Sequence, residues 1–203
     1  MKRVLKQSMM KGRTLPFLSV TFASILIGSS YDVFAYKLLE WDWRYQANPI
    51  EGAFVVCTTG APSGASQVTK DAARKWSYTK FRFTFGVDSC PNSPAANYVE
   101  FGALADPGKT AETSTPNEPV TNRMKKCVIR FNVAKSWYVG SGTPSSTQND
   151  LFSVALHEFG HCVGLDDVST PGVVMTDLLQ PGQVMRELKA DDIAGRNKVY
   201  GVP

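Results

Sequence analysis

Two histidines and a glutamate stand at a spacing that suits metal-assisted hydrolysis. They are His157, Glu158 and His161, in the H-E-x-x-H pattern. Residues four apart share one face of a helix, so both imidazoles point the same way if this segment is helical. Two neutral imidazoles on one face can bind a single Zn²⁺, and Glu158 can then reach a zinc-bound water as general base. The spacing therefore predicts a zinc site on a helix.

A third metal ligand is predicted just beyond a glycine. Gly164 lies three residues after His161, and Asp167 lies three residues after Gly164. A straight helix cannot bring a third ligand back to the same metal, whereas glycine adopts a positive φ without steric cost. We therefore expect a turn at Gly164, with Asp167 supplying a carboxylate oxygen and a fourth position left open. Met175 follows a Thr170-Pro171-Gly172 turn, and by itself it could be an ordinary core methionine.

This segment resembles the metzincin metallopeptidases, and among them the matrixins. The resemblance is carried by the run H-E-x-x-H-x-x-G-x-x-(third ligand), by Met175, and by the downstream segment 188–195 with its paired aspartates. It implies an α/β (α+β) zincin-like domain with a mixed, twisted five-stranded sheet, three helices, a zinc helix and a Met-turn beneath the metal. It also implies a protein or peptide substrate, hydrolysed with Glu158 as general base and acid.

One residue departs from the matrixin pattern. Matrixins use histidine as the third ligand, whereas this chain has Asp167, as the similar bacterial snapalysins do. A carboxylate donates charge that neutral imidazole does not, which changes the metal's affinity and its effect on water. A non-catalytic zinc-binding secreted interaction domain on the same scaffold therefore stays open as an alternative. A third interpretation, an amidase or peptidase acting on cell-wall peptides, shares the zinc chemistry and also stays open.

The sequence also limits further metal sites. The chain contains two histidines, and both belong to the predicted zinc site. The second, structural zinc that many matrixins bind through histidines therefore cannot be built here. No dense run of aspartates resembles a matrixin calcium loop, so a Ca²⁺ site has no support in the sequence.

The charge is unevenly distributed along the chain. Five of the 22 basic residues and one of the 18 acidic residues precede residue 36, which leaves 17 of each from Tyr36 onward. This balance gives no reason to expect a nucleic-acid or charged-membrane partner, and we expect a monomer.

The N-terminal segment has the layout of a secretory signal. Residues 1–13 are basic, residues 15–27 are mostly apolar, and Val33-Phe34-Ala35 offers a cleavage site. We expect residues 1–35 to be a signal peptide and residues 36–203 to be the catalytic domain of a secreted protein. The apolar run is short for a permanent membrane helix, so we expect no stable membrane insertion after cleavage, although an uncleaved anchor is the alternative.

The segments before the zinc helix follow the order strand, helix, then strands. Alternating or β-rich runs predict strands at 52–58, 81–85, 98–104 and 128–131, and apolar residues at helical spacing predict a helix at 63–77. The resemblance implies that the polar run 111–115 is an antiparallel edge strand above the cleft. Beyond the Met-turn, residues 176–179 would line an apolar substrate pocket through Leu178 and Leu179.

Two further expectations concern cysteines and the N-terminus. In an exported protein an even number of cysteines indicates disulfides, and we predict Cys57–Cys90, with Cys162 a small buried thiol. In matrixins the mature N-terminal ammonium docks on an aspartate of the last helix. Tyr36 could dock in this way on Asp191 or Asp192, although two solvated acids at a helix start are the simpler interpretation.

Overall fold

A five-stranded sheet forms the framework on which the predicted zinc helix lies. The computed structural model describes residues 35–43, 50–91, 96–118, 123–177 and 179–203, which all belong to the second of the two units into which the chain divides, residues 33–203. The strand order is β3-β2-β4-β8-β5. The strands are β2 (Ile50–Val56), β3 (Phe81–Phe85), β4 (Asn97–Gly102), β5 (Ala111–Ser114) and β8 (Val128–Asn132). Four of them run parallel, and β5 runs antiparallel to β8 at one edge.

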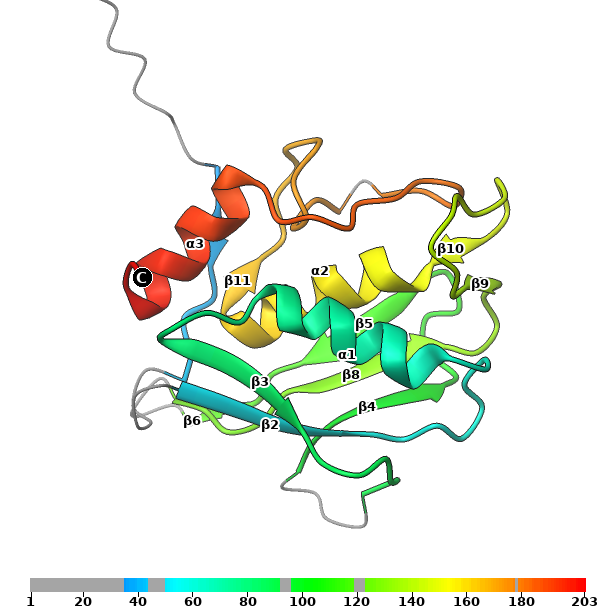
Figure 1. Ribbon diagram of the computed structural model, residues 1–203, viewed down its shortest axis with the longest axis horizontal. Coiled ribbons are helices and arrows are strands. Elements are labelled where there is room, and N and C mark those ends of the chain that lie inside the picture. The colour runs from blue at the N-terminus through cyan, green and yellow to red at the C-terminus, as the bar shows by residue number, and fades with distance from the viewer. Residues whose placement is uncertain (1–34, 44–49, 92–95, 119–122, 178) are drawn as a thin grey trace, which may run out of the picture. The chain divides into compact units, whose positions relative to one another are not determined.

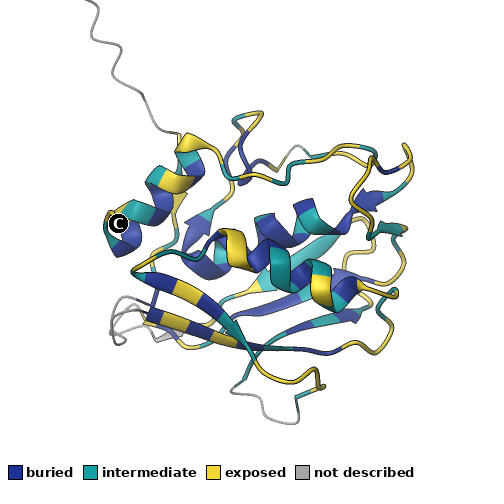
Figure 2. Cartoon of the chain, viewed as in Figure 1, coloured by how far each residue is buried: buried dark blue, intermediate teal, exposed yellow. Residues whose placement is uncertain are grey.

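Two helices cover one face of this sheet (Figure 1). They are α1 (Ala65–Lys75) and α2 (Leu151–Val163), whereas α3 (Ala190–Tyr200) packs beside the short strand β1 (Lys37–Leu38). Strand β2 alternates between buried and exposed residues, as Figure 2 shows, because only one face of the sheet is covered.

Aromatic side chains fill the space between the sheet and the helices. The ring of Phe159 in α2 lies with its centroid 5.3 Å from that of Phe54 and 4.9 Å from that of Phe83. Trp76, which follows α1, is fully buried and donates from Nε1 to the carbonyl oxygen of Leu156 at 2.8 Å. This cluster fixes α2 against both the sheet and α1, and so fixes the height of the predicted zinc ligands above the sheet.

Three two-stranded sheets accompany the large sheet within the described residues. Strand β1 pairs antiparallel with β11 (Leu165–Asp166), β6 (Asn117–Glu118) pairs antiparallel with β7 (Arg123–Met124), and β9 (Trp137–Tyr138) pairs parallel with β10 (Asn149–Asp150). None of these short strands is expected from the sequence. Two residues are too few for a period-2 pattern to show, so their pairing depends on the surrounding fold.

The predicted fold class is confirmed: the sheet is mixed and five-stranded, and it is accompanied by three helices. The predicted strands and first helix are present with boundaries shifted by at most two residues, and the edge strand is β5. The predicted pocket residue Leu178 and most of the predicted signal segment lie outside the described residues. Within the described residues, no helix is long and apolar enough to span a bilayer.

Both pairs of cysteines form disulfides, which confirms one prediction and corrects another. Cys57 pairs with Cys90, as expected. Cys162 is not a buried thiol but pairs with Cys127, which precedes β8. Both cysteines of this second pair are fully buried. Because a buried thiol and a buried half-cystine give the same apolar pattern in a sequence, the error could not be seen there.

Candidate metal centre

Helix α2 carries the two histidines and has clear determinants at both ends. At its start, the carboxylate of Asp150 caps the helix by accepting from the backbone N–H of Ser153 at 3.0 Å. At its end, Gly164 has φ 107°, and its N–H donates to the last carbonyls of the helix. This left-handed conformation strongly favours glycine, and it ends the helix where the sequence predicts a turn.

The segment after Gly164 is held by the N-terminal part of the domain. Strand β11 pairs with β1, and the N–H of Leu39 donates to the carbonyl oxygen of Gly164 at 2.8 Å. Lys37 forms an ion pair with Asp166. Asp167 follows directly and is thereby directed back over the face of α2.

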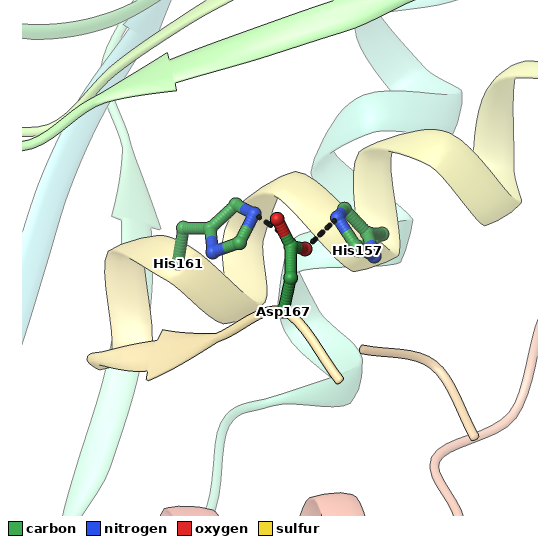
Figure 3. Close-up of side chains that lie close together, drawn as sticks. All are labelled: His157, His161 and Asp167. Atoms are coloured by element: carbon green, nitrogen blue, oxygen red, sulfur yellow. Dashed lines mark ion pairs between the residues drawn. The ribbon is translucent and has the colours of Figure 1, made fainter. Parts of the chain in front are cut away.

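The side chains of His157, His161 and Asp167 converge on one point (Figure 3). Oδ1 of Asp167 lies 3.1 Å from Nε2 of His157 and 3.4 Å from Nε2 of His161. The possible ligand atoms of the three residues all lie within 4.8 Å of one another. Two ligands of one tetrahedral zinc ion, each at about 2.0–2.1 Å, are separated by roughly 3.4 Å, which is close to these distances.

Backbone carbonyls orient both imidazoles. Nδ1 of His157 lies 2.9 Å from the carbonyl oxygen of Val174, and Nδ1 of His161 lies 2.9 Å from that of Leu165. Because a carbonyl oxygen can only accept, each Nδ1 carries a hydrogen, and each neutral ring keeps a lone pair on Nε2. When both rings are neutral, the two lone pairs face the carboxylate of Asp167, so this donor set of two nitrogens and one oxygen fits a zinc ion.

The three side chains are also electrostatically coupled. Burial lowers the pKa of His157, but the hydrogen bond with Asp167 and the charge of Glu158 outweigh burial and raise the pKa to about 9. The hydrogen bond from His157 holds the pKa of the Asp167 carboxyl below its usual value. The metal-free cluster therefore holds a proton near neutral pH that a metal ion must displace.

Glu158 lies on the floor of a cavity beside the cluster. Its side chain is buried, with 6% of the residue exposed, and it lines a cavity of about 500 Å³ together with both histidines and Asp167. The hydroxyl of Thr113, in the edge strand β5, donates to Oε2 of Glu158 at 2.5 Å. The cavity thus holds a carboxylate next to the three converging side chains.

The segment beneath the cluster is fixed by an aspartate of α3. The buried Asp192 accepts from the N–H groups of Val174 at 3.0 Å and Met175 at 3.2 Å. Met175 packs so closely on α2 that a Cβ on Gly160 would lie 2.1 Å from its sulfur. Both contacts hold the carbonyl oxygen of Val174 within hydrogen-bonding distance of Nδ1 of His157.

The neighbouring Asp191 contacts the start of the domain. Its Oδ1 accepts from the N–H of Ala35 at 2.6 Å and from that of Tyr36 at 3.1 Å. These are peptide N–H groups of an uninterrupted chain, so the docking of a free Tyr36 ammonium stays a prediction. Asp192 has a different partner, the Met-turn.

Comparison with known proteins agrees with this geometry. The sequence profile described as Matrixin matches residues 61–201, which include the whole cluster. The chain belongs to the matrixin family. Matrixins are zinc metalloendopeptidases, so the family accounts for the sheet, for the helix with two histidines and for the methionine turn below them.

Individual matrixins match over parts of the chain. Human matrix metalloproteinase-15 is 41% identical over 127 residues, or 61% of this chain and 16% of the relative. Human neutrophil collagenase is 38% identical over 77 residues (36% of this chain, 15% of the relative), and metalloendoproteinase 1-MMP of Arabidopsis thaliana is 37% identical over 75 residues (36% and 21%). The matched regions span between 15% and 21% of these curated relatives.

Some residues that shape the centre are not visible to sequence reasoning. The Nδ1 acceptors are backbone carbonyls, which carry no residue-type signal. Thr113 lies 45 residues before Glu158, and nothing in the spacing of the two indicates contact. The paired aspartates do have a signal, since they match the matrixin C-terminal helix, although their separate partners could not be assigned.

Proposed function

We propose that residues 36–203 form an exported zinc endopeptidase. The observation that supports this proposal best is the convergence of His157, His161 and Asp167 beside the buried carboxylate of Glu158. In the proposal, these three residues hold the catalytic zinc through both Nε2 atoms and a carboxylate oxygen of Asp167. Membership of the matrixin family supports the same chemistry.

The reaction divides into what the metal supplies and what the chain supplies. A bound zinc ion acts as a Lewis acid, which makes water a stronger nucleophile at neutral pH and polarises a carbonyl. Glu158 accepts a proton from the attacking water and donates it to the nitrogen of the leaving amine. Its burial beside the cavity keeps the carboxylate out of bulk water and close to the bond that breaks.

The substrate in this proposal is an extended peptide. The edge of β5 that faces away from β8 pairs with no strand of the described residues, so its N–H and C=O groups can pair with a peptide strand. Val154, Leu179 and Met185 line the cavity beyond Glu158 and favour an apolar side chain after the scissile bond.

Export is supported by the disulfides and by the N-terminal pattern. Both disulfides suit an oxidising compartment. Removal of residues 1–35 would turn the Tyr36 N–H, which already lies near Asp191, into an ammonium that pairs with this carboxylate. Measuring the mass of the exported protein tests this cleavage.

Substitution of Glu158 tests the catalytic assignment. Glu158→Ala should leave zinc content at one ion per chain and lower kcat for a quenched peptide by about 10²–10⁴-fold, the usual contribution of a general base. The matched control is Glu187→Ala, an exposed glutamate paired with Lys75 that does not line the cavity, and it should keep the parental rate. Equal rates for Glu158→Ala and the parent would reject the assignment.

Asp167 favours one second candidate, a non-catalytic zinc-binding domain. Its side chain is half-exposed, and it replaces the histidine of the matrixin pattern. In that case the protein would hold one zinc ion but hydrolyse neither casein nor peptides. Zinc content and turnover, measured on the same sample that starts at Tyr36, separate the two functions.

A further inference from the structure

The edge strand β5 contributes a side chain, and not only backbone groups, to the candidate centre. The single hydroxyl hydrogen of Thr113 points to Glu158, with Oγ1 2.5 Å from Oε2 and 3.3 Å from the backbone carbonyl oxygen of the same residue. The shorter contact is to the charged acceptor, which makes it the stronger hydrogen bond. In the sheet, Thr113 is opposite Ile129 of β8, so the position of this hydroxyl is fixed by the strand pairing.

The carboxylate of Glu158 has few other constraints. Within the described part of the chain, Thr113 is its one hydrogen-bond partner. Bulk water can supply little further hydrogen bonding, because only 6% of the surface of Glu158 is exposed. A long side chain in this position would otherwise sample several rotamers, each with a different orientation toward the cavity.

We propose that Thr113 is a positioning residue for Glu158. It donates to Oε2 and so holds the carboxylate in one orientation, which leaves Oε1 to accept the proton of the attacking water. The inference depends on the proposed function, because it assigns Thr113 a role in that reaction. Strand β5 would then have two roles: Thr113 orients the general base, and the backbone edge of the strand pairs with the peptide. Together these contacts would fix Glu158 relative to the peptide bond that breaks.

The simpler alternative is that Thr113 is an ordinary contact between a strand and a helix. The two roles differ in which atoms matter. Thr113→Val keeps the shape and removes the hydroxyl, whereas Thr113→Ser keeps the hydroxyl and removes a methyl group. A positioning role requires the hydroxyl, whereas a packing role requires the volume.

The experiment compares kcat, KM and zinc content of the full chain and its variants on a quenched peptide. Thr113→Val should lower kcat about tenfold or more with KM within about twofold, because the backbone of β5 is unchanged. Thr113→Ser should restore kcat to within about threefold of the parent. All variants should hold one zinc ion. The matched control is Thr69→Val in α1, which removes a buried hydroxyl that has no hydrogen-bond partner among the described residues, and kcat should not change.

A thermal measurement provides a readout without turnover. In a double-mutant cycle, Thr113→Val should lower the melting temperature of the zinc-free parent but have little effect in the Glu158→Ala background, since the partner is already gone. Additive shifts would overturn the proposed pairing.

The outcomes separate this inference from the proposed function. If the parent hydrolyses the peptide and Thr113→Val has the parental kcat, or if Thr113→Ser is as slow as Thr113→Val, the positioning role is wrong and the endopeptidase assignment stands. If the parent binds zinc and hydrolyses nothing, both are wrong.

Discussion

The two sides of the cavity are held in different ways. On the metal-facing side, both histidines are oriented by backbone carbonyls, and the helix that carries them is tied to β8 by the buried Cys127–Cys162 disulfide. The opposite side is the segment 179–186, which we name the outer wall. None of its residues belongs to a helix or strand, and polar side-chain contacts hold it in place.

Arg186 is the main contact of the outer wall. It donates to both carboxylate oxygens of Asp150, whose side chain is fully buried, and to the carbonyl oxygens of Gly140 and Ser141. The hydroxyl of Ser153 accepts from the N–H of Met185 at 2.7 Å, which adds a second link to the start of α2. The groups that orient the two histidines therefore differ from the groups that hold the outer wall.

Removing Arg186 should have the largest effect on stability. Arg186→Met leaves the carboxylate of Asp150 buried without its cation, which should cost about 3–5 kcal/mol in the free energy of unfolding. Zinc content at low temperature should stay at one per chain, while the preference for residues after the scissile bond broadens. Urea unfolding and a peptide library measure the two effects.

The exposed pair of Arg82 and Glu51 provides the control for this change. Arg82→Met should cost less than about 1 kcal/mol. If Arg186→Met lost zinc affinity while keeping the parental cleavage preference, the separation of the two sides would be wrong.

The two disulfides allow the metal-facing side to be tested by itself. They close loops of nearly equal length, with sequence separations of 35 for Cys127–Cys162 and 33 for Cys57–Cys90, so replacing either pair by alanine should cost about 4 kcal/mol. Zinc affinity, measured by competition with a chelator, should fall for the Cys127/Cys162 variant alone, because Cys162 adjoins His161. Equal affinities in both variants would show that the disulfide does not position the ligands.

The pH dependence of zinc binding should show a smaller effect. His157 has a pKa of about 9 in the metal-free fold and 6.5 as the ordinary value. The protonated imidazole therefore stabilises the metal-free fold fully below about pH 6.5, and this contribution is lost as the pH rises through about 9. Zinc requires the neutral ring, so binding at pH 7.5 should release about one proton, and affinity should rise about tenfold per pH unit up to about pH 9.

The number of protons released on zinc binding can be measured by titration calorimetry in two buffers of different ionisation enthalpy. The low pKa of the Asp167 carboxyl means that Asp167 contributes none at this pH. Binding without proton release would contradict the coupling between His157 and Asp167.

The difference between the two sides of the cavity also explains which features could be predicted from the sequence. On the metal-facing side, H-E-x-x-H and Gly164 are local patterns whose geometry follows from helical periodicity and from the positive φ of glycine. The edge strand and the fold class were predictable because they follow from a resemblance to matrixins, and the Cys57–Cys90 pair was also predicted correctly.

The outer wall and the second disulfide were not predictable, for a physical reason. Arg186 and Asp150 are 36 residues apart, and either residue by itself suits an exposed position. Cys162 has the apolar surroundings of a free thiol, and only the fold brings Cys127 next to it. The same holds for Thr113, whose hydroxyl would serve equally on a solvated edge strand.

The most direct test of the account is the zinc affinity of Asp167→Ala. One ligand of a zinc site contributes about 2.5–4 kcal/mol if the total of about 10–16 kcal/mol is shared by four ligands. The account predicts one zinc ion per parent chain and an affinity lowered by about 10²–10³-fold in Asp167→Ala, with Asp71→Ala on the exposed face of α1 at the parental value. Parental zinc affinity in Asp167→Ala would contradict the account.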